Sequence, residues 1–446
     1  MKNTITLLLA GLLAATTTAA TAVTFAAAPA AVAPDAKQPK AKAKAKATIR
    51  DQDRVSESAR TSHPSSAKPD FVTLTWTGDP STTQTIRWRT NPAVTTGTLA
   101  LARADGAPFD LATATKFTAV TQTLATPNIT NDPAINFHTV TLTGLEPGTR
   151  YIFSAGGGAS DDWFWTPPQP FTTAPAPGEL AESYSFIYIG DTQGATADWG
   201  NMMRDALQKR PGAAFLIVTG DLVNLGRQRN QYDDLFYNAR GVFNALPVVP
   251  TPGNHDYQGG GPRVFLDYFA LRANGPKNIG PGLAYSFEYS DALFVVLDSN
   301  RNVKEQAAWL EEQLRGTKAT WKFVAYHHPA YNARAGRSNP DAIRYWVPLF
   351  DKYHVDIVFQ GHDHAYMRTY PMRAGKRVAS PKDGTVYLVS YSCPKSYELQ
   401  KHAYTEVGFE NVPTWQVIDI TPATRALRFR AYDAAGKLRD EFMIKK

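Results

Sequence analysis

Five apolar runs after residue 180 each end directly in a short cluster of Asp, Asn or His. The runs alternate with segments that have the 3.6-residue apolar period of amphipathic helices. Strand-helix alternation predicts a mostly parallel sheet, whose strands share one carboxyl edge where ligands gather. We therefore expect the five clusters to converge; they are Gly190-Asp191, Gly220-Asp221, Gly253-Asn254-His255-Asp256, His327-His328-Pro329 and Gly361-His362-Asp363-His364.

The same periodicity gives approximate bounds for the elements of this region. Strands are expected at 185–189, 214–218, 248–249, 293–297, 323–326 and 355–359. Helices are expected at 198–210, 228–245, 303–314 and 341–353.

Residues 67–175 show a different pattern, with short β-branched and aromatic runs separated by turns rich in Gly, Pro, Asp and Asn. The runs lie at 71–76, 85–88, 98–102, 138–142 and 150–155. This spacing is typical of a small antiparallel β-sandwich. The segment holds no cluster of Cys, His or acidic residues, so we expect no catalytic group in it.

The first 66 residues are expected to lie outside the folded domains. A basic start and an apolar run over 5–15, followed by small residues, indicate a signal peptide that ends near residue 28, with cleavage after residue 22 as the alternative. Residues 29–66 are rich in Ala, Pro and Lys without an apolar face, and we interpret them as a disordered linker. No later stretch has the ~20 apolar residues of a membrane span. These features predict a secreted protein, extracellular or associated with the cell wall.

The formal net charge of +7 does not indicate a nucleic-acid partner. Residues 35–60 hold eight positive and four negative side chains, and Lys2 lies in the predicted signal peptide. The rest of the chain has a charge of about +2, too small to define a phosphate-binding surface. Two interpretations of the Lys-rich segment stay open, a solvated spacer and a basic contact to anionic cell-wall polymers.

The residue types in the five clusters predict a dinuclear metal site. Carboxylate, amide oxygen and imidazole suit Mn, Fe, Zn or Co, and the lack of thiolate ligands argues against a structural zinc. His362 and His364 stand two residues apart in an extended loop, so both can point to one side. Two ions ~3.5 to 4 Å apart are the usual arrangement for in-line displacement at phosphorus.

The clusters, in their order, resemble the motifs of calcineurin-like metallophosphoesterases: Gly-Asp, Gly-Asp-Leu-Val-Asn, Gly-Asn-His-Asp, His-His-Pro and Gly-His-Asp-His. The preceding segment, with Thr-Ile-Arg-Trp-Arg-Thr at 85–90, resembles the fibronectin type III-like N-terminal domain of purple acid phosphatases. The resemblance implies an antiparallel β-sandwich at 67–175. It implies an α/β metallophosphoesterase domain at 180–446, with a β-sandwich core flanked by helices and a second sheet completed by strands at 385–390 and 414–420.

The resemblance also implies a role for each cluster residue. The first metal would bind Asp191 and His364, Asp221 would bridge, and the second metal would bind Asn254, His327 and His362. His255 would stabilise transition-state charge or protonate the leaving oxygen. We expect His327 as the ligand of the His-His pair, and His328 behind it or against the substrate.

Several positions depart from these families. Gln193 stands where many metallophosphoesterases have a His, and Asn224 where purple acid phosphatases have the Tyr that colours ferric iron. Either residue is a candidate to supply an oxygen to the first metal, the alternative being a weakly held ion, and we predict a colourless protein. The substrate-binding His pair of purple enzymes is also missing. Arg334 and Arg337 are the candidates to bind phosphate there, although exposed loop arginines are the simpler interpretation.

Together these features predict a secreted hydrolase of small phosphate esters that uses two divalent or trivalent ions of Fe, Mn or Zn. A phosphomonoesterase of the acid phosphatase type, with in-line attack by a metal-bound hydroxide, is the first expectation. Two alternatives stay open. One is a phosphodiesterase acting on nucleotides, glycerophosphodiesters or cell-wall polymers, and the other is a non-catalytic cell-surface binding protein.

Overall fold

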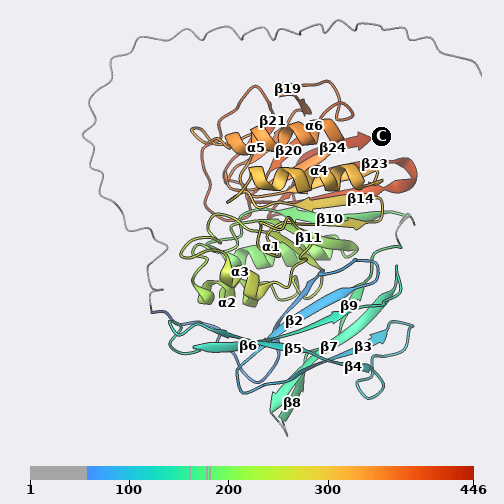
Figure 1. Ribbon diagram of the computed structural model, residues 1–446, viewed down its shortest axis with the longest axis vertical. Helices are drawn as coiled ribbons and strands as arrows, with labels where there is room; N and C mark the ends of the chain where they lie inside the picture. Colours follow the sequence, from blue (N-terminus) through green and yellow to red (C-terminus); the bar gives the residue numbers. More distant parts are fainter. Residues whose placement is uncertain (1–57, 160–161, 177–178, 180–181) are drawn as a thin grey trace, which may run out of the picture. The chain divides into compact units, whose positions relative to one another are not determined.

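The computed structural model describes residues 58–159, 162–176, 179 and 182–446 (Figure 1). The predicted signal peptide and most of the predicted linker lie outside the described residues. The end of the predicted linker, residues 58–66, differs from expectation because it contacts the folded chain. The Ala59 amide donates to the Asn128 carbonyl at 2.8 Å, and the Ser65 hydroxyl donates to Asp132 at 2.8 Å. The folded part therefore begins before residue 66.

Residues 70–172 form the predicted antiparallel sandwich. One sheet has the order β1-β2-β6-β5, and the other has the order β4-β3-β7-β8 with β9 paired to β7. The strands are β1 (Asp70–Thr75), β2 (Gln84–Thr90), β3 (Gly97–Arg103), β4 (Thr115–Thr118), β5 (Val120–Ala125), β6 (Ala134–Leu142), β7 (Arg150–Ala159), β8 (Asp162–Trp165) and β9 (Gln169–Thr172). Leu74, Ile86 and Trp88 of one sheet and Leu99 and Phe153 of the other share a core.

Two further sheets make up the second domain. The first, in the order β12-β11-β10-β22-β23-β24, contains β10 (Tyr184–Ile189), β11 (Ala213–Thr219), β12 (Val248–Thr251), β22 (Thr414–Thr421), β23 (Ala426–Asp433) and β24 (Leu438–Lys445). The second, in the order β13-β14-β15-β16-β20-β17-β21, contains β13 (Tyr285–Tyr289), β14 (Ala292–Val296), β15 (Trp321–Ala325), β16 (Ile357–Gln360), β17 (Tyr366–Thr369), β20 (Val386–Val389) and β21 (Thr405–Phe409). A small hairpin of β18 (Met372–Arg373) and β19 (Lys376–Arg377) stands apart.

Aromatic side chains fill the space between these two sheets. Phe186 and Phe215 of the first sheet contact Phe294 of the second at ring-centroid distances of 5.2 and 5.1 Å. Rings at such distances pack favourably beyond their buried area. The two sheets thus form the expected β-sandwich core.

Helices cover the outer face of each sheet, as Figure 1 shows. The helices α1 (Thr196–Lys209), α2 (Arg229–Asn238) and α3 (Arg263–Tyr268) share a core with β10, β11 and β12. The helices α4 (Ala307–Gly316), α5 (Pro340–Tyr345) and α6 (Val347–Tyr353) share another with β14, β15 and β16, and the 3-10 helix η2 (Lys304–Gln306) precedes α4. Another 3-10 turn, η3 (Pro422–Thr424), joins β22 to β23.

Three details differ from the expected elements. The helix expected at 341–353 is two helices, because Pro348 has no amide hydrogen to continue the first one. The helix expected at 228–245 ends at Asn238, shortly before Gly241 turns the backbone at a φ of +81°. The strands expected at 385–390 and 414–420 lie in different sheets, β20 beside β16 and β22 beside β10.

No helix in the described residues has both the length and the apolar character needed to cross a bilayer.

Candidate metal centre

The first two acidic residues of the predicted site come together because their strands are parallel neighbours. β10 and β11 pair in register with Ile189 opposite Val218, and Asp191 and Asp221 each follow their strand by two residues. Both residues have left-handed backbone, with φ of +52° and +51°, as do His362 and His364. Non-glycine residues in this conformation cost energy and gather at functional sites.

Close backbone approach explains the glycines that precede two of the clusters. A Cβ on Gly253 would lie 2.2 Å from a carboxylate oxygen of Asp221, and one on Gly361 would lie 2.5 Å from Asp191. A side chain at either position would displace the acidic groups. The Gly-Asn and Gly-His steps are therefore required by the packing of the loops.

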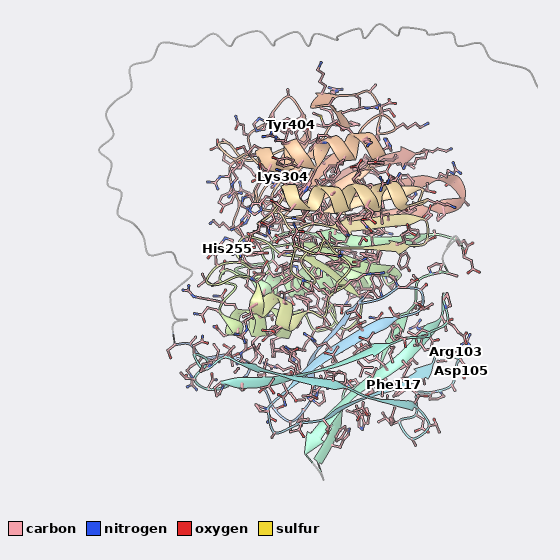
Figure 2. The ribbon with its side chains drawn as sticks, viewed as in Figure 1. Arg103, Asp105, Phe117, His255, Lys304 and Tyr404 are labelled. Atoms are coloured by element: carbon pink, nitrogen blue, oxygen red, sulfur yellow. The ribbon has the colours of Figure 1, made fainter. Side chains whose placement is uncertain are left out.

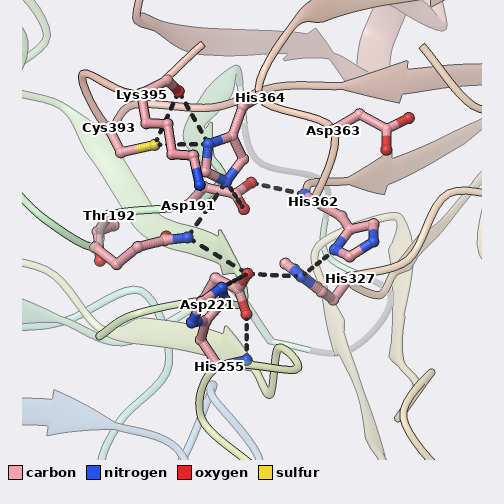
Figure 3. Close-up of polar contacts among 12 residues, drawn as sticks. Asp191, Thr192, Asp221, His255, His327, His362, Asp363, His364, Cys393 and Lys395 are labelled. Carbon is pink, nitrogen blue, oxygen red and sulfur yellow. Dashed lines mark hydrogen bonds and ion pairs between the residues drawn. The ribbon is translucent and has the colours of Figure 1, made fainter. Parts of the chain in front are cut away.

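Asp191 and His364 face each other at one end of the site (Figure 3). The Asp191 Oδ1 atom is buried, lies 3.3 Å from His364 Nε2, and has no hydrogen-bond donor among the described residues. The His364 Nδ1 atom donates to the Lys395 carbonyl at 2.9 Å. This bond leaves Nε2 facing the carboxylate, either as a lone pair when the ring is neutral or as a donor when it is protonated.

Asp221 lies in the middle of the site and meets His327 and Asn254. His327 Nε2 is 3.1 Å from Asp221 Oδ2, 3.2 Å from Asn254 Oδ1 and 3.2 Å from His362 Nδ1. The other nitrogen of His327 donates to the Thr219 carbonyl at 2.8 Å. His327 Nε2 thus faces a cluster of acceptor oxygens, to which a protonated ring donates and a neutral ring presents its lone pair.

This arrangement fits bound cations. Lone pairs that converge on carboxylate and amide oxygens repel one another unless a proton or a metal ion lies between them. Two imidazoles fixed through backbone carbonyls on their far nitrogens match the usual support of metal-ligating histidines. Ligand atoms of Asp191, Asp221 and His327 lie within 4.8 Å of one another, as do those of His327, His328 and His362.

The pKa values show the same attraction for positive charge. Burial opposes protonation of His327, but Asp221 and Asp191 outweigh it and raise the pKa of His327 to about 9. Burial raises the pKa of Asp221, yet His327 and His255 lower it to about 2. By contrast, burial and the charge of His327 lower the pKa of His362, which keeps that ring neutral and able to bind a metal.

His255 lies beside Asp221 (Figure 3), and its label lies at the edge of the second domain in the view of Figure 2. Its backbone amide donates to Asp221 Oδ1 at 2.8 Å, and its Nε2 lies 4.0 Å from Asp221 Oδ2. Its Nδ1 donates to the Asn224 carbonyl at 2.7 Å, and 31% of the side chain is exposed. Nε2 is thus free to exchange a proton with a bound molecule.

The two candidates for an extra metal ligand are placed differently. Gln193 is buried, with Nε2 at 3.4 Å from Asp221 Oδ2 and 3.3 Å from His364 Nε2, while its Oε1 has no donor among the described residues. A half-turn of the amide exchanges these two atoms and places the oxygen between Asp221 and His364. The Asn224 side chain is exposed, and Asn224 serves the site through its backbone carbonyl to His255.

The predicted substrate-binding residues lie around the His362–His364 loop. His328 Nδ1 is 2.9 Å from the Ser299 hydroxyl, and its ring centroid is 4.4 Å from that of His362. Arg337 donates to the His362 carbonyl at 2.6 Å and to Asp363 at 2.8 Å, so its guanidinium supports this loop. Arg334 lies over the Tyr397 ring, 3.9 Å from the ring centroid.

Comparison with known families agrees with the layout of the two domains. Residues 184–366 match the family model described as calcineurin-like phosphoesterase, and residues 69–173 match that of the purple acid phosphatase N-terminal domain. The chain contains a calcineurin-like phosphoesterase domain. A purple acid phosphatase N-terminal domain precedes it, as the sequence predicted.

Relatives and solved structures extend this similarity. An uncharacterized protein of Mycobacterium tuberculosis is 29% identical over 302 residues, which cover 56% of each chain. Fe(3+)-Zn(2+) purple acid phosphatase 12 of Arabidopsis thaliana is 28% identical over 255 residues, which cover 52% of each chain. The matches thus span just over half the length of these relatives. The structure of a purple acid phosphatase from yellow lupin seeds has the same fold, with a TM-score of 0.73 and 17% identity over 85% of this chain and 74% of that one.

Two groups at the candidate site were not predicted from the sequence. Ser299, which contacts His328, follows β14 in a polar run of Asp298, Ser299 and Asn300. The strand-end rule that found the other clusters applies to this run too. Lys395 and Tyr397 follow β20, but no Asp, Asn or His comes directly after that strand, and the first acidic residue of the segment is Glu398. The strand-end rule therefore does not mark this loop.

Proposed function

We propose that this protein is a metal-dependent phosphomonoesterase. The observation that carries the proposal is the convergence of the His327 and His364 Nε2 atoms on the oxygens of Asp191, Asp221 and Asn254, a buried group of atoms that attracts positive charge. The resemblance to purple acid phosphatases in both domains supports hydrolysis of a phosphate ester. The name of the Arabidopsis relative specifies Fe(3+) and Zn(2+), which supports iron and zinc among the expected metals Fe, Mn and Zn.

Each residue of the site then has a definite task. Asp191 and His364 would hold one metal ion, with the amide oxygen of Gln193 as a further ligand, and Asp221 would serve both ions. The second ion would be held by three residues, Asn254, His327 and His362. When bound, such a pair of ions binds phosphate oxygens and makes water a nucleophile near neutral pH.

His255 is proposed to transfer the proton. The Asn224 carbonyl fixes Nδ1 as the protonated nitrogen of the neutral ring, which leaves Nε2 toward the solvent side of Asp221. From there His255 donates a hydrogen bond or a proton to the oxygen of the leaving group when its ring is protonated. The leader pattern further supports a secreted enzyme that acts on small phosphate esters outside the cell.

The test compares a chromogenic monoester with the matching diester. The purified protein is supplied in turn with Mn, Zn and Fe, and hydrolysis of para-nitrophenyl phosphate and bis-para-nitrophenyl phosphate is measured in parallel. Asp221→Asn should abolish turnover, whereas Asp383→Asn, the same change at an exposed position, should keep it.

Dominant turnover of the monoester supports the proposal. Dominant turnover of the diester would replace it with a phosphodiesterase, which the missing pair of substrate-binding histidines makes the second candidate. Metal binding without hydrolysis of either ester would contradict both and favour a binding protein.

A further inference from the structure

Two loops beyond the strand ends join beside His364. Tyr397, in the loop after β20, donates its backbone amide to the His364 carbonyl at 3.0 Å. The same loop pairs with the loop after β15, through a bridge between Arg334 and Leu399 and a bond from the Gln400 amide to the Ala333 carbonyl at 2.8 Å. Backbone hydrogen bonds therefore fix the position of both loops relative to the metal centre.

These loops place three positive side chains around one aromatic ring. The guanidinium of Arg334 lies 3.9 Å from the Tyr397 ring centroid, Lys395 Nζ lies at 5.0 Å and the Arg337 guanidinium at 5.1 Å. The Tyr397 ring is itself stacked on His364, with a centroid distance of 4.7 Å. We call Tyr397 and the three positive residues Arg334, Arg337 and Lys395 the Tyr397 cluster. It lies one ring away from the groups proposed to bind metal.

The charges of the Tyr397 cluster are only partly compensated. Asp363 pairs with Arg337 at 2.8 Å. Among the described residues, no carboxylate lies within ion-pair distance of Arg334 or Lys395. Like charges held near one ring repel each other, and an anion that binds between them removes that repulsion. Lys395 is exposed and Arg334 is half-buried, so a ligand can reach both.

We infer that Arg334 and Lys395 bind a second anionic group of the substrate, a phosphate or carboxylate separate from the ester that is cleaved. The inference rests on the proposed phosphomonoesterase function. The reacting phosphate must lie against the Asp and His groups of the metal centre, whereas these cations surround the neighbouring ring. Arg337 is the positioning residue of this subsite, because its hydrogen bonds go to His362 and Asp363.

The test uses pairs of substrates that share an ester and differ in one anionic group. Glycerol 3-phosphate and 3-phosphoglycerate differ by a carboxylate, and fructose 6-phosphate and fructose 1,6-bisphosphate differ by a phosphate. For each pair, the kcat/KM of the compound with the second anionic group is divided by the kcat/KM of the other compound. This ratio is measured in wild type, Lys395→Met, Arg334→Met and the double variant. Lys376→Met, an exposed lysine in β19, is the matched control.

We expect the ratio to exceed one in wild type and to fall about tenfold in the double variant, mainly through KM, since two charge contacts are lost. Lys395→Arg should keep part of the preference that Lys395→Met loses. Lys376→Met should leave the ratio unchanged. A fall confined to one pair identifies the group as carboxylate or phosphate. An unchanged ratio in both pairs, with the double variant folded and active, overturns the inference.

Failure of the proposed function is distinguishable from failure of the subsite. If wild type hydrolyses none of the four compounds, the phosphomonoesterase proposal fails. Calorimetric titration of the same proteins with 3-phosphoglycerate and with fructose 1,6-bisphosphate then measures binding and tests the subsite separately. Weaker binding of either compound by the double variant supports the subsite, and equal binding of both by wild type and the double variant overturns it.

Discussion

Backbone carbonyls around the site determine which ring nitrogen of its histidines carries the proton. The rings of His255, His327 and His364 each donate from Nδ1 to a backbone carbonyl, which fixes Nε2 as the free nitrogen. A carbonyl oxygen only accepts, so the tautomer of each neutral ring is decided by the fold. Ring orientation and ligand basicity are set in the same contact.

His255→Gln should lower kcat about 10² to 10⁴-fold, because the amide cannot exchange a proton with the leaving oxygen. Metal content, measured by elemental analysis, should stay unchanged, since His255 approaches Asp221 no closer than 4.0 Å with its ring. His63→Gln is the matched control, because the His63 ring stacks on Tyr237 of α2 and, within the described residues, contacts none of the proposed metal ligands. A large loss of metal in His255→Gln would show that this residue is a ligand.

The protein should be colourless when it is loaded with iron. The position three residues after Asp221 is Asn224, whose exposed amide has no charge-transfer transition with ferric iron. An absorption spectrum of the iron-loaded protein tests this prediction. A visible band that disappears on reduction would show that a tyrosine from elsewhere in the fold binds the iron.

At the scale of elements, the loop after β16 is held in place by a buried carboxylate between its two histidines. Asp363 is fully buried and accepts from the Ala333 amide at 2.6 Å and from Arg337 at 2.8 Å. These bonds tie the loop after β16 to the loop after β15. Side chains alternate along this loop. His362 and His364 point toward the candidate metal centre, and Asp363 points to the opposite side, where it anchors the loop.

Asp363→Ala should weaken metal binding about 10 to 100-fold, as expected when a residue that supports ligands is removed. The reason is that His362 and His364 lose the anchor of their loop. Titration with Zn or Mn followed by calorimetry measures the affinity. Asp351→Ala, in α6, is the control, and unchanged affinity in Asp363→Ala would refute the anchoring role.

In the sandwich, strand β6 carries a buried histidine that should make stability depend on pH. His138 lies between the hydroxyls of Thr90, at 2.7 Å, and Thr121, at 2.9 Å. Burial lowers the pKa of His138 from 6.5 to about 4. Between these values the unfolded chain binds more protons than the folded chain, so stability is fully present above pH 6.5 and is lost as the pH falls toward 4.

This loss should reach up to about 3 kcal/mol, at about 1.4 kcal/mol per unit of pKa shift. His138→Gln keeps partners for both hydroxyls but does not titrate, so its stability should decline less over the same range. Urea unfolding of both proteins at pH 7, 5.5 and 4 measures the difference. Equal pH slopes for the two proteins would contradict the assignment.

At the scale of the whole molecule, all the described residues fall within one unit, and a buried ionic cluster joins its two domains. Arg89 of β2 is fully buried and donates to Asp233 of α2 at 2.8 Å and to Asp70 at 2.8 and 2.7 Å. Tyr268 also donates to Asp233. Sandwich residues such as Phe71 and Phe137 share an apolar core with α1, α2 and α3. The two domains are therefore expected to unfold together.

Arg89→Met should lower the free energy of unfolding by about 3 to 5 kcal/mol, because it leaves the buried Asp233 with less compensation. Scanning calorimetry should show one transition in wild type and separate transitions for the two domains in the variant. Arg150→Met, at an exposed position of β7, should behave as wild type. Two transitions already present in wild type would show that the domains are independent.

The sequence by itself determined the two domains, the strand ends and the five clusters of metal-type residues. These features depend on local periodicity and on residues adjacent in the chain, such as an apolar run followed by Gly361-His362. Where local signals conflicted, as at Pro348 within an apparent helix, the predicted element was too long.

Only the tertiary structure decided which partner each group meets. The carbonyls that orient His327 and His364, the use of Arg337 as a support, and the Tyr397 cluster all join loops far apart in the chain. Backbone carbonyls are present at every residue and so carry no signal in the sequence. Their contribution exists only once the two sheets pack and bring the loops after β10, β11, β15, β16 and β20 to one edge.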